Sequence, residues 1–262
     1  MSFETISLNT DDRGVSTLSL NRPEKHNAMS GQMIDELALA TDQISKDSQT
    51  RVVVLTGAGE SFCAGGDLEW MRIQFDADRQ GRISEATKLA KMLFALNTIP
   101  KPLIGRIQGS AYGGGVGLMC VCDVVIGVDS AKFGLTETRL GLIPATISPY
   151  VIARMGEAKA RRVFMSSRRF GADEAIELGL LAKTVSPADL EEAIEREVLP
   201  YLSTAPGAVA SAKALARHLG PAINEDVITE TATRLANAWE QPEAKEGISA
   251  FFEKRNPSWI NQ

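Results

Sequence analysis

Hydrophobic and polar residues alternate with two different periods along this chain of 262 residues. The segments 3–8 and 15–20 alternate with the two-residue period of a half-buried strand. An Asp/Gly cluster at 11–14 separates them, which predicts an opening β-hairpin. Continuous apolar runs, typical of strands buried on both faces of a sheet, lie at 51–56, 102–107 and 123–128.

Segments with helical spacing of their apolar residues lie between these strands. One follows Ser30, whose side chain is suited to cap a helix, and a second covers 84–96. An apolar segment with helical potential at 116–122 directly follows the central glycines. Residues 69–83 are charged and show no clear period, so we expect a mobile segment that lines the entrance of a site. The alternation of strand and helix predicts βαβ units with right-handed crossovers.

The second half of the chain is mostly helical in pattern. Glycine and proline residues mark plausible helix ends. Helices are predicted at 148–155, 158–165, 172–178, 187–202, 206–219, 225–239 and 242–254. Only 181–185 has the pattern of a strand. The sequence therefore predicts an α/β core followed by a helical region.

Composition limits the classes of function. Hydrophobic residues make up 44% of the chain and charged residues 23%, which is usual for a soluble globular protein. A net charge of −5 provides no basic surface for nucleic acid, and no apolar run is long enough to span a membrane. Three cysteines and two histidines make a disulfide framework or a metal site unexpected. With no secretory signal recognised, we expect a cytoplasmic protein.

Two glycine-rich loops each follow a predicted strand. The first ends in Cys63-Ala-Gly-Gly-Asp-Leu68, and the second is Gly109-Ser-Ala-Tyr-Gly-Gly-Gly115, at the start of a predicted helix. Glycine lets a ligand approach the backbone, and a helix start leaves N–H groups unpaired. Such N–H groups favour an anion or a developing oxyanion. A single turn of this kind also occurs for close packing alone, so other residues have to show whether these loops bind a ligand.

Together the two loops resemble the oxyanion-hole segments of the crotonase, or enoyl-CoA hydratase/isomerase, superfamily. The resemblance follows the family's order over almost the whole chain, through 21–28, Cys122-Asp123, Phe133-Gly134, Glu137, 140–144 and 252–255. It implies an α/β fold, a spiral of ββα units with a helical C-terminal region for trimer formation, and trimers that commonly stack into hexamers. Residues 1–200 would form the core with the CoA and oxyanion-hole loops, and 201–262 the helical region that also caps the active site.

The resemblance implies that the ligand is an acyl-CoA thioester. The backbone N–H groups of Gly66 and Gly114 would stabilise the negative charge that develops on the thioester oxygen. Losing one such donor costs about 3–4 kcal/mol in comparable sites. Coenzyme A is part of the substrate, so no separate cofactor and no metal are implied.

The acid–base residues depart from the family's usual hydratase pattern. Such hydratases carry two glutamates, and the matching positions here are Gly117 and Glu137. One glutamate can take a proton from water and then return a proton to C2, and burial would raise its pKa toward the working range. An isomerase that moves a double bond also needs only one base. Hydration and isomerisation therefore both stay open.

The stretch 140–151 helps to choose a substrate. Together with 112–118 it resembles the bacterial methylglutaconyl-CoA hydratases of leucine degradation and their relatives that act on isohexenylglutaconyl-CoA. Our leading expectation is hydration of 3-methylglutaconyl-CoA; the alternatives are an isomerase and a non-catalytic CoA- or RNA-binding homologue. The distal carboxylate of such a substrate needs a cation or several donors nearby. The candidate cations are Arg72, Lys88 and Arg139.

The resemblance also assigns the CoA-binding residues. The nucleotide and pantetheine would lie along Arg22, Lys25 and Ala28. The adenine and thioester would lie along Ala64 and the backbone of Gly66, Asp67 and Leu68. Lys254 resembles a basic residue that reaches a phosphate. Trp70 and Met71 are candidates to line the acyl pocket, whereas His26 and His218 are given no role.

Overall fold

The central element of the computed structural model, which describes residues 3–260, is a six-stranded sheet of order β1-β2-β3-β4-β6-β9. Its strands are β1 (Ile6–Thr10), β2 (Val15–Leu20), β3 (Val52–Gly57), β4 (Leu103–Ile107), β6 (Val124–Val128) and β9 (Lys183–Val185). The first two form the expected antiparallel hairpin, and the remaining pairs are parallel. The hairpin and the buried strands are therefore confirmed.

A second, three-stranded sheet was missed by the sequence analysis. It contains β5 (Ala111–Tyr112), β7 (Lys132–Gly134) and β8 (Phe170–Gly171) in the order β5-β7-β8. These strands are two or three residues long, too short to show a period. The sheet matters for the site because β5 ends directly before the central glycines.

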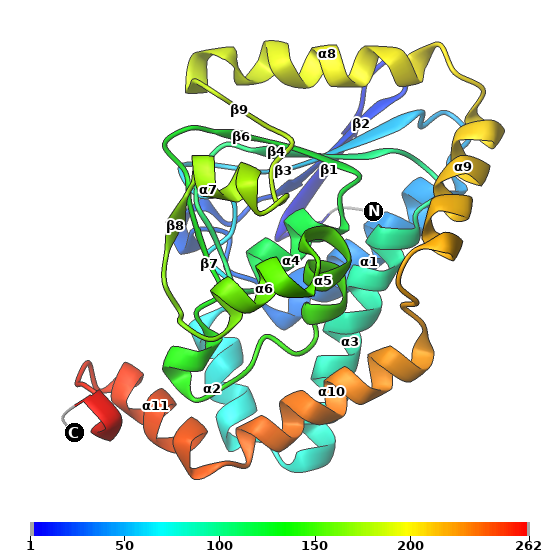
Figure 1. The fold of residues 1–262 in the computed structure, drawn as a ribbon. Helices are drawn as coiled ribbons and strands as arrows, with labels where there is room; N and C mark the ends of the chain where they lie inside the picture. Colours follow the sequence, from blue (N-terminus) through cyan, green and yellow to red (C-terminus); the bar gives the residue numbers. More distant parts are fainter. Residues whose placement is uncertain (1–2, 261–262) are drawn as a thin grey trace.

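Helices cover both faces of the large sheet (Figure 1). On one side lie α1 (Gly31–Lys46), α3 (Arg79–Thr98) and α4 (Gly114–Val121), and on the other lies α8 (Leu190–Leu202). Ser30 caps α1 as expected, because its hydroxyl accepts the N–H of Met33 at 3.2 Å. No helix within residues 3–260 is both long and apolar enough to cross a membrane.

The segment 69–83, which shows no clear period in the sequence, is mostly helical, and its mobility stays a prediction. The helix α2 (Leu68–Asp76) occupies its first part, and α3 begins at Arg79. Asp67 caps α2 and Asp78 caps α3, so both starts are fixed by carboxylates. Only Met71 and Gln74 of α2 are buried, which left no apolar period to recognise.

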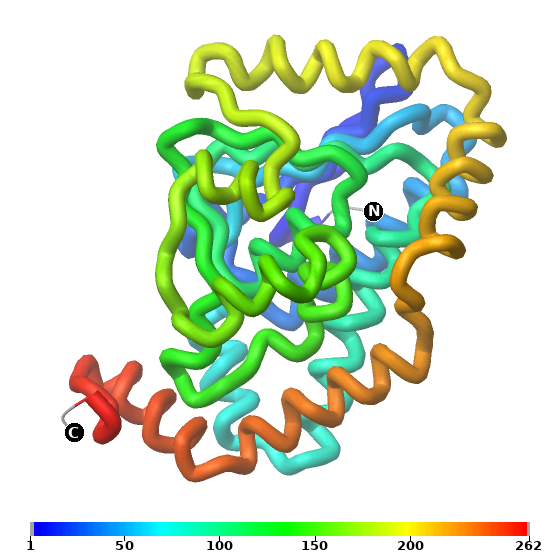
Figure 2. Tube along the Cα trace, viewed as in Figure 1, coloured from blue at the N-terminus to red at the C-terminus, as the bar shows by residue number. Residues whose placement is uncertain are grey.

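The helical second half agrees closely with the predicted boundaries. Besides α8, it contains α5 (Ser148–Met155), α6 (Glu157–Phe164), α7 (Ala172–Glu177), η3 (Pro187–Asp189), α9 (Pro206–Leu219), α10 (Glu225–Trp239), α11 (Pro242–Phe252) and η4 (Ser258–Ile260). Two short 3₁₀ turns precede these helices, η1 (Pro23–Lys25) and η2 (Glu137–Leu140). Figure 2 shows the last three long helices running around the outside of the core. The division at residue 200 falls inside α8 and stays a prediction.

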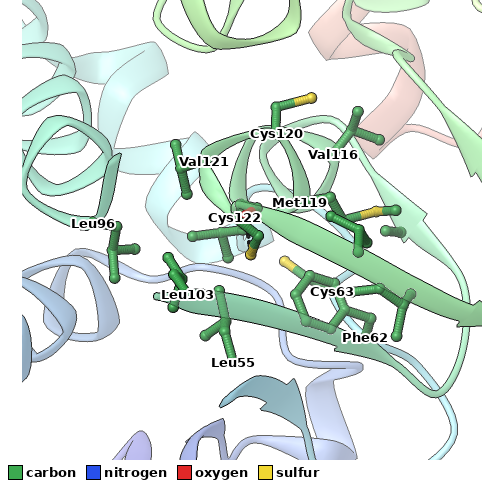
Figure 3. Packing of buried hydrophobic residues seen from close by; sticks show 14 of the residues in the cluster. Leu55, Phe62, Cys63, Leu96, Leu103, Val116, Met119, Cys120, Val121 and Cys122 are labelled. Atoms are coloured by element: carbon green, nitrogen blue, oxygen red, sulfur yellow. Dashed lines mark hydrogen bonds between the residues drawn. The ribbon is translucent and has the colours of Figure 1, made fainter. Parts of the chain in front are cut away.

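The main hydrophobic core lies on both faces of the large sheet, against α1, α3 and α4 on one side and α8 on the other. Figure 3 shows Leu55 and Leu103 from the strands facing residues of α4 such as Met119. All three cysteines lie in this core as free thiols, and burial raises the pKa of each to about 12. They therefore serve as packing residues.

Candidate active site

The fold brings the two glycine-rich loops into direct contact. The backbone N–H of Tyr112 donates to the carbonyl of Cys63 at 2.9 Å, and a parallel bridge joins Cys63 to Ala111. A Cβ atom added to Gly113 would lie 4.0 Å from the Cα of Gly65. Gly113 has a φ of 50°, a left-handed conformation that favours glycine. The two loops that the resemblance singled out thus form one site.

Each loop presents a backbone N–H without an acceptor among residues 3–260. Met29 donates to the carbonyl of Gly65 at 2.8 Å and accepts from Asp67 at 2.9 Å, which leaves the intervening Gly66 N–H unused. Gly114 is the first residue of α4, so its N–H has no partner within the helix. These are the two donors that the resemblance assigned to the thioester oxygen, and their pairing as an oxyanion hole stays a prediction.

Met29 is a residue that the sequence analysis missed. Its backbone holds both neighbours of Gly66, and its side chain covers Gly114 so closely that a Cβ added there would overlap the Met29 methyl group. Met29 therefore touches both loops, beside Gly66 and beside Gly114. No sequence pattern marks this role, since an apolar residue before a helix cap is ordinary.

Glu137 lies at the start of η2 with its carboxyl group against the glycine turn. A Cβ atom on Gly113 would lie 3.0 Å from the Glu137 Oε1. The residue as a whole is half-buried, but its Oε2 is fully buried and has no hydrogen-bond partner in the described part of the chain. Burial raises the pKa of this carboxyl to about 7, although the backbone N–H groups of Glu137 and Thr136 act in the opposite direction. Such a carboxyl can exchange protons near neutral pH.

The space beside Gly117 is filled. A Cβ atom on Gly117 would overlap the Cγ2 of Ile147 and lie 3.0 Å from its Cβ. Ile147 is buried, and Leu93 closes the same space at 3.9 Å. A glutamate at this position would therefore need Ile147 to move. The absence of the family's first glutamate is thus built into the packing of the site.

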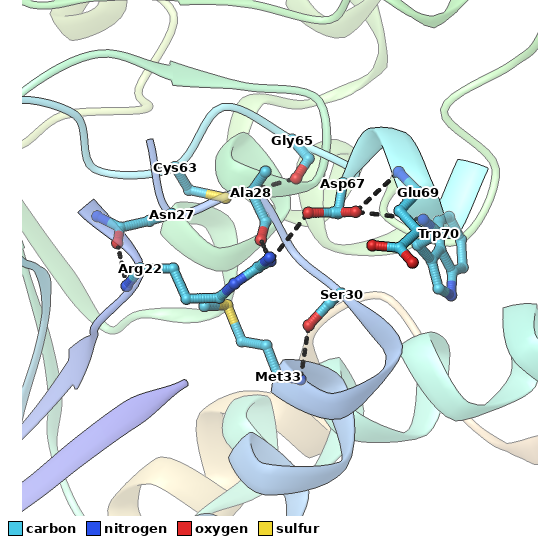
Figure 4. A network of polar contacts seen from close by, with 10 residues as sticks. All are labelled: Arg22, Asn27, Ala28, Ser30, Met33, Cys63, Gly65, Asp67, Glu69 and Trp70. Atoms are coloured by element: carbon cyan, nitrogen blue, oxygen red, sulfur yellow. Dashed lines mark hydrogen bonds and ion pairs between the residues drawn. The ribbon is translucent and has the colours of Figure 1, made fainter. Parts of the chain in front are cut away.

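Arg22 and Asp67 join the loop 21–28 to the first glycine-rich loop (Figure 4). The Arg22 guanidinium donates to an Asp67 carboxylate oxygen at 3.0 Å and to the carbonyl of Ala28 at 2.8 Å. The other Asp67 oxygen accepts the N–H groups of Glu69 and Trp70, which starts α2. Both residues were assigned to CoA, and the structure gives them internal contacts; their contact with CoA stays a prediction.

Asn27 is a second residue without an assigned role in the sequence analysis. It is fully buried, and its Oδ1 accepts the backbone N–H of Arg22 at 2.9 Å. Its Nδ2 donates to the carbonyls of Ala58 and Ser61, each at 2.8 Å. One amide thus ties the Arg22 loop to the loop that leads to Gly66.

The other residues assigned to CoA are placed as follows. Lys25, Ala64, Gly66 and Leu68 are exposed, and Ala28 is half-buried. Lys254 is exposed in the turn after α11, and among the described residues no contact links it to these loops. A Cβ on Gly66 would lie 3.6 Å from Met71 and 3.8 Å from Trp70, which supports both as lining of an acyl pocket.

A cavity of about 1070 Å³ lies elsewhere, under α9. It is lined by Arg217 and by the ion pair of Lys213 with Asp123, and it includes neither Glu137 nor the two oxyanion-hole glycines. We place the candidate active site at the glycine loops, because both loops carry an N–H group that is unpaired within the described residues and the Glu137 carboxyl lies against Gly113.

Comparison with known proteins identifies the family of the chain. The sequence profile described as enoyl-CoA hydratase/isomerase matches residues 10–262. YngF of Bacillus subtilis, whose name assigns it to the enoyl-CoA hydratases/isomerases, is 36% identical over 262 residues, 96% of each chain. A trans-2-decenoyl-[acyl-carrier-protein] isomerase of Streptococcus mutans is 31% identical over the full length of both chains.

Solved structures give the same result. An enoyl-CoA hydratase from Shewanella pealeana superposes with a TM-score of 0.81 at 36% identity, over 98% of this chain and 96% of that one. AtuE from Pseudomonas aeruginosa superposes with a TM-score of 0.79 at 37% identity, over 98% of this chain and 99% of that one. The crotonase-type fold is thereby confirmed. The chain belongs to the enoyl-CoA hydratase/isomerase family of the crotonase superfamily.

Proposed function

We propose that the protein is a lyase that adds water across the C2–C3 double bond of 3-methylglutaconyl-CoA, with Glu137 as its only acid–base residue. The observation that carries the proposal is the Glu137 carboxyl, buried on one oxygen, unpartnered there, and placed beside the Gly113–Gly114 turn. A carboxyl that is kept out of water next to two free N–H donors is suited to proton transfer at the carbon next to a thioester.

The reaction follows from these groups. The thioester oxygen accepts the N–H groups of Gly66 and Gly114. The ionised Glu137 takes one proton from a water molecule while the water oxygen bonds to C3, and the electrons of the double bond move onto the thioester oxygen as an enolate. The protonated Glu137 then returns its proton to C2, so that one water has been added in total. The same carboxyl removes the proton from water and delivers it to C2, which predicts addition of both groups to one face of the double bond.

Arg72 is the cation that we propose for the distal carboxylate of this substrate. It follows Met71, which lies against Gly66, and its guanidinium lies 4.9 Å from the ring of Phe252 on α11. Arg72 therefore links α2, which lies beside Gly66, to α11, which packs on η2. Arg72 has no carboxylate partner within residues 3–260, whereas Lys88 pairs with Glu85 at 2.7 Å. Arg139, the third candidate, is exposed.

Isomerisation is a second candidate because of one observation. Ile147 fills the place of a second carboxylate, and moving a double bond between C3 and C2 needs only one proton-shuttling base. The similarity to the Streptococcus mutans isomerase supports this alternative. The same Glu137 and the same N–H groups would serve both reactions.

A comparison of substrates tests the proposal. We would measure kcat/KM for 3-methylglutaconyl-CoA, crotonyl-CoA and 3-enoyl-CoA with the same purified protein. We expect the branched dicarboxylic substrate to be preferred, and Arg72→Ala to remove that preference while Lys88→Ala, the matched control, keeps it. Turnover of the 3-enoyl-CoA alone would establish the isomerase, and turnover of none of them would contradict both candidates.

We further propose that CoA lies along Lys25 and Ala64, with Lys254 near a phosphate, and that the chain assembles as a trimer or as a hexamer of two trimers. The exposed positions of these three residues are compatible with contact to a ligand. Light scattering of the purified protein measures the assembly. Loss of affinity for free CoA in Lys25→Ala and Lys254→Ala measures the two cationic contacts.

A further inference from the structure

The helix α11 lies so close to η2 that their backbones are in contact. Gly247 is buried in α11, and a Cβ atom there would lie 2.6 Å from both the carbonyl carbon and the carbonyl oxygen of Leu140. Gly141, directly after η2, has a φ of 70°, and a Cβ on it would overlap the carbonyl of Glu243 and lie 2.6 Å from the N of Ala244. The two segments therefore meet at two points that leave no room for any side chain.

Apolar packing holds this contact closed. Leu142, Ala244 and Ile248 are buried in a separate hydrophobic cluster together with Trp239 of α10. The N–H of Leu142 donates to the carbonyl of Glu137 at 3.1 Å. A displacement of α11 would thus be passed to the turn that carries the catalytic carboxyl, because packed interiors yield little.

We infer that Gly247 is a positioning residue: its lack of a side chain seats α11 directly on η2, and this fixes the Glu137 carboxyl in place and keeps water from it. The inference rests on the proposed role of Glu137 as the base. The other charged residues of the two packed segments, Arg139, Glu243, Lys245 and Glu246, make no hydrogen bond or ion pair with that carboxyl among residues 3–260, and Glu246 pairs with Arg255 instead. Exclusion of water, rather than a nearby charge, is what α11 contributes.

Gly247→Ala tests the inference, with Gly207→Ala as its matched control. Both glycines lie within helices, so alanine favours the helix in each case. A Cβ on Gly207 meets nothing within 4 Å. We expect Gly247→Ala to lower kcat by about tenfold to a hundredfold with KM within about twofold, as small misplacements of catalytic groups do. The Gly207 variant should match the wild type.

The pKa of the Glu137 carboxyl is the second readout, and it needs no substrate. It can be followed by infrared difference spectra between each protein and its Glu137→Gln counterpart. In Gly247→Ala we expect this pKa to fall from about 7 toward the ordinary value of 4.5, because water reaches the carboxyl. The titration does not depend on the acyl group of the substrate. It can therefore show whether Gly247 positions Glu137 even if the proposed substrate is wrong.

Ile248→Ala provides an independent variant, because it loosens the same contact by removing packing rather than by a clash. We expect the same direction of change in both kcat and the Glu137 pKa. Wild-type kcat and pKa in both folded variants would overturn the inference. So would a loss of activity with an unchanged pKa, because a merely structural role would reduce the amount of folded enzyme and leave the titration as it was.

Discussion

Replacing Glu137 with Gln should stabilise the protein at alkaline pH while it destroys the base. Burial sets the pKa of this carboxyl at about 7 in the folded state, against an ordinary value of 4.5 in the unfolded chain. Between these pH values the folded protein holds a proton that the unfolded chain has released, so the free energy of unfolding of the wild type falls as the pH rises. The fall ends above pH 7. The difference of about 2.5 between the pKa values corresponds to about 3 kcal/mol.

Urea unfolding of both proteins at pH 4.5, 6 and 8 measures this effect. Glutamine resembles the protonated carboxyl and does not titrate, so every other ionisable group cancels in the difference between the two proteins. The free energy of unfolding of Glu137→Gln should be nearly equal to that of the wild type at pH 4.5, somewhat higher at pH 6 and about 3 kcal/mol higher at pH 8. A difference that does not change with pH, or a wild type that is the more stable protein at pH 8, would refute the reasoning.

Three further predictions follow from the packing of the site. Gly117→Ala should lower the free energy of unfolding in urea by about 1–3 kcal/mol, because its Cβ overlaps Ile147. The loss should be smaller in a protein that also carries Ile147→Ala. An equal loss with and without Ile147→Ala would show that the side chains at 117 and 147 do not compete for space. Asn27→Ala should cost about 3 kcal/mol in the same assay, since three hydrogen bonds of about 1 kcal/mol each are lost; a loss well under 1 kcal/mol would contradict this. Gly114→Ala should lower kcat at least about tenfold, because its Cβ overlaps Met29 and displaces the N–H donor, and an unchanged kcat would remove Gly114 from the oxyanion hole.

Much of the fold follows from the sequence because its elements are long and regular. The helices at 148–155, 206–219 and 225–239 begin and end where the spacing of apolar residues and the prolines place them. The short strands β5, β7 and β8 carry no such period, and α2 buries only two residues. Where an element is this short or this exposed, long-range contacts and caps determine the structure, and a local pattern cannot show them.

The candidate site divides in the same way. The positions of Glu137, Gly66 and Gly114 follow from motifs that the chain shares with its family. The reason for the glycine at 117 cannot be predicted from the sequence, because Ile147 lies beside Gly117 only through the packing of a segment distant along the chain. Met29 and Asn27 act through their backbone or amide contacts to other loops, which depend on the fold. Gly247 shows its role only when α11 is placed on η2.

The central claim is that one buried carboxyl performs both proton transfers. The most direct test is the rate of hydration of 3-methylglutaconyl-CoA between pH 5 and 9 by the wild type and by Glu137→Gln. Because the base must be ionised, kcat/KM of the wild type should rise through a single ionisation near the pKa of about 7. Glu137→Gln should bind CoA as the wild type does and lose turnover by about a thousandfold or more. Full activity in Glu137→Gln, or a wild-type rate without an ionisation in this range, would contradict the account.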